Sequence, residues 1–110
     1  MEDSNMHEAA MSFVGAIKQS SEYRAYAMQL EKIKRQEEVF EQVNEFRQKN
    51  FQIQTSEEAE NLLDIMDELE KEYEVLSENP IVVDFLDAEA AFCRMMQEIN
   101  MFIMEKIDFE

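Results

Sequence analysis

The feature that most limits the fold of this chain is its near lack of turn-forming residues. Its 110 residues include a single glycine, Gly15, and a single proline, Pro80, whereas an average protein carries several per cent of each. Hairpins and β-sandwiches depend on such residues, while the abundant glutamate, glutamine, alanine, leucine and methionine favour helices. The sequence therefore predicts an all-α protein, an antiparallel bundle of four to five helices that forms one domain over residues 1–110.

Capping residues and apolar periodicity divide the chain into helices. Asn79 followed by Pro80 is typical of a helix start, because asparagine caps free amides and proline suits the first helical position. Thr55 and Glu58 have the spacing of a capping box. Five polar residues at 34–38 interrupt the apolar pattern and predict a break. We therefore expect helices over approximately residues 6–18, 22–34, 37–54, 56–78 and 80–107.

The last predicted helix is unusually apolar. Its polar residues fall on one narrow stripe, and apolar residues cover well over half of its circumference, whereas an ordinary surface helix has an apolar arc of somewhat over 100°. We expect this long helix to be central in the bundle, or to be covered on a second side by another chain. Phe85, Phe92 and Ile99 are expected to face inward, and a second flank with Met95 and Phe102 is expected to form a subunit contact.

Other residues are candidates for the same partner surface. Tyr23 and Tyr26 are expected to pack near the last helix, and Met101 lies in line with its polar stripe. Glu89 falls among aromatic residues, where a carboxylate needs a partner. It is expected to pair with a basic residue of segment 22–54, or else to lie at a subunit interface. The predicted partner surface comprises Tyr23, Tyr26, Phe85, Glu89, Phe92, Met95, Met101 and Phe102.

The charge of the chain limits its partners. It carries 26 acidic and 10 basic residues, a net charge of −16. Phosphate backbones and anionic membranes are bound by clustered lysine and arginine, so the charge argues against direct nucleic-acid binding and against a membrane surface. Residues 55–79 hold ten acids and one base. This stretch is expected to be a solvated face or a dock for a basic protein.

No residue pattern supports a catalytic or metal site. His7 and Cys93 are the sole residues of their kinds; His7 lacks partner residues, and Cys93 is expected to be a buried thiol in a reducing compartment. The acidic stretches match neither an EF-hand loop nor a Glu-x-x-His motif. No apolar run is long enough to span a membrane. We therefore expect a cytoplasmic protein that is not an enzyme, without cofactor, metal or small-molecule ligand. The alternative is a small-molecule- or metal-binding bundle, or an accessory subunit of an enzyme.

An ordered set of residues is similar to a known family. The set comprises Tyr23 and Tyr26 after a Ser–Ser junction, Phe46 with Gln48, Asn79–Pro80, Phe85, Ala88–Glu89, and Ile99, Ile103 and Ile107. In order and spacing over residues 6–109, it resembles the YlbF/YmcA family of bacterial regulators of the control-of-competence type.

The resemblance implies a small helical bundle of a Gram-positive type bacterium that acts through protein contacts. Family members influence competence, sporulation and biofilm programmes, and some assist a membrane-anchored endoribonuclease in mRNA processing. Some carry several C-terminal cysteines linked to an iron–sulfur cluster, which usually needs about four thiolates. With Cys93 alone, one chain cannot hold such a cluster. We therefore expect a regulatory adaptor that forms a homodimer or higher homo-oligomer, or a hetero-complex with sister regulators and a ribonuclease.

Overall fold

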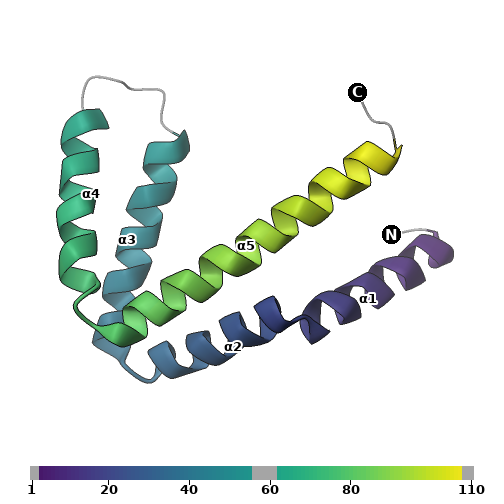
Figure 1. Ribbon diagram of the computed structural model, residues 1–110, viewed down its shortest axis with the longest axis horizontal. Helices are drawn as coiled ribbons and strands as arrows, with labels where there is room; N and C mark the ends of the chain where they lie inside the picture. The colour runs from purple at the N-terminus through teal and green to yellow at the C-terminus, as the bar shows by residue number, and fades with distance from the viewer. Residues whose placement is uncertain (1–2, 56–61, 108–110) are drawn as a thin grey trace. The chain divides into compact units, whose positions relative to one another are not determined.

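The computed structural model describes residues 3–55 and 62–107, which form helices joined by short turns, with no strand in these ranges. The helices are α1 (Ser4–Gln19), α2 (Ser21–Lys34), α3 (Glu37–Thr55), α4 (Leu62–Leu76) and α5 (Pro80–Ile107) (Figure 1). The prediction of an all-α protein is confirmed. The expected helix start at residue 56 and the capping partner Glu58 lie outside the described residues.

Short polar side chains determine where the first helices begin and end. Asp3 caps α1, because its carboxylate accepts a hydrogen bond from the Asn5 amide at 2.9 Å. Between α1 and α2, the hydroxyl of Ser20 donates to a carbonyl of α1 at 2.6 Å. The same hydroxyl accepts a hydrogen bond from the Tyr23 amide at 3.1 Å. Ser20 therefore ends α1 and caps α2.

The start of α5 follows from Asn79 and Pro80, as the sequence predicts. The side-chain oxygen of Asn79 accepts a hydrogen bond from the Ile81 amide at 3.1 Å. Pro80 occupies the first helical position, where its missing N–H costs nothing. From there α5 continues for 28 residues. The other predicted break is also visible, since α2 ends at Lys34 and α3 begins at Glu37.

The chain divides into two compact units, each built from separate stretches of helix. The α1/α5 unit comprises Met1–Met28 and Asp87–Glu110, and the α3/α4 unit comprises Gln29–Leu86. Helices α2 and α5 each contribute residues to both units. The two units are described separately below.

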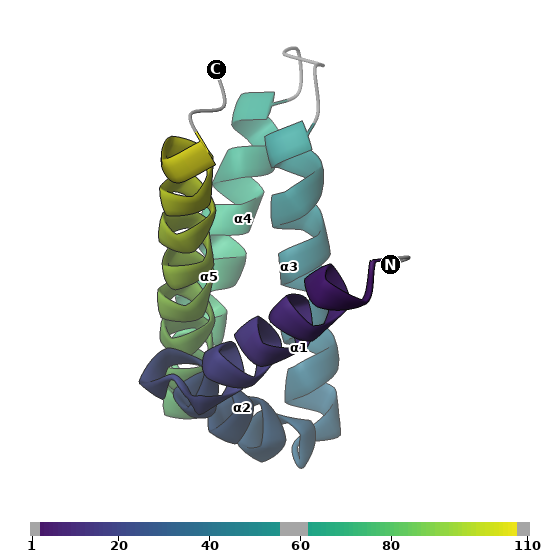
Figure 2. The same ribbon diagram turned by 90° about the vertical axis from the view of Figure 1, so that its right-hand side faces the viewer.

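The buried core belongs to the α3/α4 unit. Its two main helices run antiparallel and pack side by side (Figures 1 and 2). The rings of Phe46 in α3 and Tyr73 in α4 lie 6.0 Å apart between their centroids. Among the described residues of the whole chain, the buried apolar side chains all belong to this unit: Ile33, Val43, Leu69, Val82 and Phe85.

One ion pair joins the two main helices of the α3/α4 unit. The Lys49 ammonium donates to the Glu72 carboxylate at 2.6 Å. This hydrogen bond and the attraction between the two charges raise the pKa of Lys49 above its ordinary value. Because the Lys49 and Glu72 side chains remain 49% and 38% exposed, water screens the pair and it contributes little to the free energy of unfolding.

Candidate protein-interaction surface

The α1/α5 unit lacks a buried core. None of the side chains described in this unit is fully buried, and α1 in particular buries no residue. A folded unit normally covers the apolar faces of its helices with a second layer. The described part of the α1/α5 unit is therefore a single helical layer that has an uncovered apolar side.

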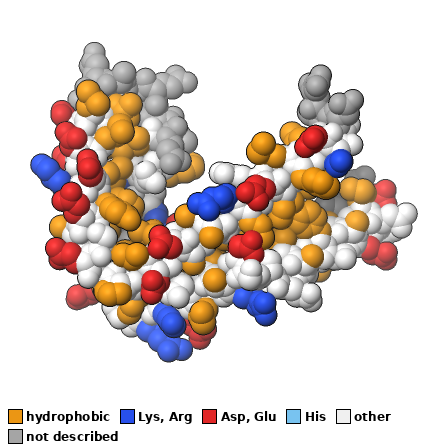
Figure 3. Space-filling model, in the orientation of Figure 1, with side chains coloured by type: hydrophobic (Ala, Val, Ile, Leu, Met, Phe, Trp, Pro, Cys, Tyr) orange, Lys and Arg blue, Asp and Glu red, His pale blue; other side chains and the backbone are white. Residues whose placement is uncertain are grey.

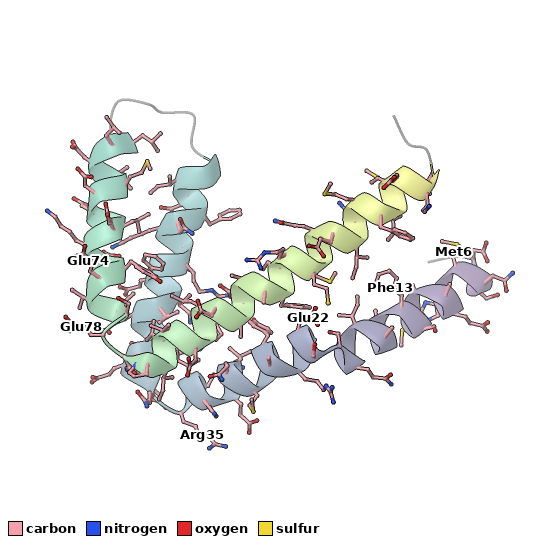
Figure 4. All side chains as sticks on the ribbon, viewed as in Figure 1. Met6, Phe13, Glu22, Arg35, Glu74 and Glu78 are labelled. Carbon is pink, nitrogen blue, oxygen red and sulfur yellow. The ribbon has the colours of Figure 1, made fainter. Side chains whose placement is uncertain are left out.

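An open groove lies between α1 and the C-terminal half of α5. Its volume is ≈ 530 Å³. Phe13 projects from α1 into the space between the two helices (Figure 4). None of the residues that line the groove is charged: they are Ala9, Ser12, Phe13, Ala16, Ile17, Ser20, Met95 and Ile99. The small side chains on α1 recur every three or four residues, so they share one helical face and leave space for a large side chain.

Large apolar side chains surround the groove. Seven of them, on α1 and on the end of α5, are between 36% and 62% exposed. Figure 3 shows hydrophobic side chains gathered over the C-terminal end of α5 and on the side of α1 that faces it. We call these residues the open apolar face: Met6, Phe13, Val14, Phe102, Ile103, Met104 and Ile107. The residues on α5 lie on more than one side of the helix, and the Lys106 ammonium lies over the Phe102 ring, 5.5 Å from its centroid. This number of exposed large apolar side chains is typical of an interaction site.

Two of the predicted partner residues pack against another side chain of the same unit. Tyr23 and Tyr26 of α2 both pack against Phe92 of α5. The ring centroids of Tyr23 and Phe92 are 5.5 Å apart in an edge-on arrangement, and those of Tyr26 and Phe92 are 5.4 Å apart and stacked. Such aromatic pairs each contribute about 0.5–1.5 kcal/mol beyond the area they bury. The three half-buried rings therefore hold α2 to α5 beside the groove.

The other predicted partner residues are divided between core and surface. Phe85 is fully buried, with the guanidinium of Arg47 over its ring at 5.4 Å from the centroid. A fully buried ring offers no surface to a partner, so Phe85 is a core residue and the open apolar face excludes it. Glu89 is half-buried, and Met95 is half-buried where it lines the groove. Met101 is 70% exposed at the edge of the face.

The expectation for Cys93 was wrong. The sequence predicts a buried thiol because Cys93 follows Phe92 on the apolar part of α5. In the structure Cys93 is exposed. Helical periodicity places it on the same side of α5 as Met104, three turns further along. The described residues do not cover this side of the helix, which explains the difference.

The groove is the part of the surface that the sequence did not reveal. The signal for it was present, because Ala9, Ser12 and Ala16 follow one another at helical spacing on α1. Small residues at such spacing allow a neighbouring side chain or helix to approach closely. Two other possibilities find no support in residues 3–55 and 62–107: no group of histidine, cysteine, aspartate or glutamate is arranged to hold a metal ion, and no helix there is long and apolar enough to cross a membrane.

Comparison with known proteins identifies the family. Residues 6–108 match the family described as "Control of competence regulator ComK, YlbF/YmcA". The chain belongs to the YlbF/YmcA family. The resemblance seen in the sequence is therefore confirmed, and the family is one of competence regulators.

Curated relatives of this YlbF/YmcA family member carry the name UPF0342 protein. The relative from Desulfitobacterium hafniense strain Y51 is 33% identical over 107 residues, which cover 94% of this chain and 85% of the relative. The relative from Caldicellulosiruptor bescii is 25% identical over 96% of this chain and 91% of the relative. The relative from Caldicellulosiruptor saccharolyticus is 23% identical over 96% of this chain and 90% of the relative. No solved structure matches the chain.

Proposed function

We propose that this protein is a regulatory adaptor without catalytic activity, which acts by binding other protein chains through the open apolar face. The observation that carries the proposal is the contrast between the two units. Among the described residues, the buried side chains belong to the α3/α4 unit, which leaves six large apolar side chains exposed, while the α1/α5 unit buries none and leaves ten exposed. The description of the family as competence regulators supports a regulatory role for such contacts.

The energetics favour a partner that is itself apolar. Complete burial of one large apolar side chain contributes about 1.5–3 kcal/mol. Because the seven side chains are about half exposed, covering all of them contributes at most on the order of 5–10 kcal/mol from this chain. Association costs an estimated 4–15 kcal/mol in lost translational and rotational freedom. The partner must therefore contribute a similar apolar surface for the complex to be stable.

The family description and the charge of the chain support a proposal for the regulated process. We propose that the protein contributes to competence, sporulation and biofilm programmes by assisting a ribonuclease in mRNA processing, in a complex with sister regulators. With a net charge of −16, the chain repels the RNA backbone. The ribonuclease, and not this chain, therefore contacts the RNA. The adaptor supplies an apolar docking face, and the ribonuclease supplies the chemistry.

The proposal is tested in the natural host by replacing the gene with single variants. Phe102→Asp places a charge in the open apolar face, whereas Val75→Asp makes a comparable change at an exposed position of α4, where the side chain is 67% exposed. Phe102→Asp is expected to reproduce the deletion in competence assays and in transcript 5′-end mapping, while Val75→Asp retains function. Full function of Phe102→Asp at normal protein level would contradict the proposal.

A further inference from the structure

We propose that the α3/α4 unit has a docking surface of its own, which binds a basic amphipathic helix of another protein. The surface consists of an apolar stripe along α3 and α4 and of an acidic stripe that borders it on α4. It lies on other helices than the open apolar face, so it stands or fails independently of the proposed function.

The apolar side of the two main helices is covered at one end. The core residues Ile33, Val82 and Phe85 belong to the last turn of α2 and to the start of α5. Both segments join the unit at the end where α3 begins and α4 ends (Figure 1). At the opposite end, Phe51 of α3 is 65% exposed and Met66 of α4 is 49% exposed. Two antiparallel helices with an open apolar side can accept a third helix, which completes a small bundle.

The exposed side chains of α4 continue a single helical stripe. Its apolar residues are spaced by four and three positions, so they share one side of the helix; they are Leu62, Met66, Leu69, Tyr73 and Leu76. Leu69 is buried, whereas Met66 and Tyr73 remain 49% and 43% exposed. The stripe extends over the fifteen residues of α4, which is about 22 Å, the length of a partner helix of about four turns.

Phe51 extends the apolar stripe on α3. The guanidinium of Arg47 lies over the ring of Phe85 at 5.4 Å from its centroid, so this side of α3 faces the start of α5. Phe51 follows Arg47 by one helical turn and lies on the same side of α3, beyond that contact. Figure 3 shows hydrophobic side chains in a column along α3 and α4, with acidic side chains along the outer edge of α4.

Charge indicates the chemistry of the partner. Asp67, Glu70 and Glu74 each follow a residue of the apolar stripe by one position, so they form a parallel acidic stripe about 100° further round α4. All three are exposed, and among the described residues none of them forms an ion pair. The corresponding edge of α3 carries the uncharged Gln48 and Gln52. The complement of this surface is a helix with an apolar stripe that has lysine or arginine along one edge.

Synthetic peptides test the chemistry of this surface on the full chain. The probe is a helical peptide of about four turns with a leucine stripe and lysine along one edge, and the control peptide has glutamate in place of each lysine. Fluorescence anisotropy is expected to give the lysine peptide a dissociation constant below about 100 μM at about 50 mM salt, and weaker binding at about 500 mM. The glutamate peptide should not bind. Equal binding of the two peptides, or no binding of the lysine peptide, would overturn the proposal.

Two triple variants separate a local acidic stripe from the net charge of the chain. One neutralises the stripe with Asp67→Asn, Glu70→Gln and Glu74→Gln. The other removes the same number of charges at exposed positions of the α1/α5 unit, with Glu8→Gln, Glu98→Gln and Glu105→Gln. The first is expected to weaken the lysine peptide by at least about 5-fold at low salt, and the second by less than about 2-fold. Equal losses would show that the net charge alone attracts the peptide and would overturn the proposal.

A second pair of variants tests the apolar stripe. Met66→Gln keeps the length of the side chain but makes it polar, and Met11→Gln makes the same change on α1, where the side chain is 58% exposed. Met66→Gln is expected to weaken the lysine peptide by about 3–10-fold at low and high salt, because apolar contact is lost, while Met11→Gln binds as the wild type does. Circular dichroism confirms that both variants keep their helices. Equal affinities of the two variants would contradict a role for the stripe.

A further measurement does not depend on how a variant folds. Amide chemical shifts of the wild-type chain are recorded by nuclear magnetic resonance while the lysine peptide is added. The largest changes are expected in α4 and in the second half of α3, around Phe51 and Met66. Changes concentrated in α1 and at the end of α5 would place the peptide on the open apolar face instead and would overturn the proposal.

Discussion

Replacing Phe85 by alanine gives the sharpest test of how stability is distributed in this protein. Phe85 has no exposed surface, and its ring lies 5.4 Å from the Arg47 guanidinium. Truncation of a buried phenylalanine to alanine typically costs about 3–5 kcal/mol, because apolar contact is lost and a cavity remains. The cation–π contact with the half-buried Arg47 adds about 0.5–2 kcal/mol to this loss. Since small domains have about 5–15 kcal/mol of stability in total, the variant should lie near the threshold of unfolding.

The assay is urea denaturation followed by circular dichroism at matched chain concentrations, with Phe102→Ala as the control. Both variants lose the same atoms, but Phe102 is 58% exposed. At submicromolar concentration we expect a cost of about 3–5 kcal/mol for Phe85→Ala and below about 1 kcal/mol for Phe102→Ala. A cost below about 1 kcal/mol for Phe85→Ala, or equal costs at low concentration, would refute the reasoning.

Three further changes test local features of the fold. Asn79→Ala removes the cap of α5 and should lower the free energy of unfolding by about 1 kcal/mol in urea titrations; an unchanged midpoint would show that the cap is unimportant. Ser20→Ala removes the hydroxyl that serves both α1 and α2, and we expect a loss of helical circular dichroism and about 1 kcal/mol of stability, with Ser21→Ala as the unaffected control. Lys49→Gln breaks the contact with Glu72. Because the folded pKa of Lys49 is raised above 10.5, the small advantage of the wild type should be constant at neutral pH and disappear only as the pH rises beyond about 10.5; a melting-temperature difference that vanishes near pH 7 would contradict this.

The helices follow closely from the sequence because their signals are local. Scarcity of glycine and proline predicts helices, and Asn79 with Pro80 places the start of α5. The polar stretch at 34–38 contains the junction between α2 and α3. The cap of α1 was less predictable, since Asp3, Ser4 and Asn5 are all suitable caps and only the backbone geometry selects among them.

Which apolar faces are covered could not be read from the sequence. Phe85 and Phe102 lie on the same strongly apolar helix, yet one is fully buried and the other 58% exposed. Phe13 likewise lies on the side of α1 that faces α5, yet it remains 36% exposed. Periodicity shows which side of a helix can be buried; it does not show whether the chain supplies a second layer to bury it.

The α1/α5 unit is expected to obtain its core from another protein chain, and hydrogen exchange tests this most directly. Backbone amides of α1 are measured in the dilute purified chain and in the tagged chain isolated with its partners from the natural host, with the amides around the buried Val43 as the internal reference. An uncovered helix of this length is marginal in water, so protection over Ser4–Gln19 should be weak in the purified chain and rise in the complex, while protection around Val43 stays constant. Equal, strong protection of α1 in both samples would contradict this dependence on a partner.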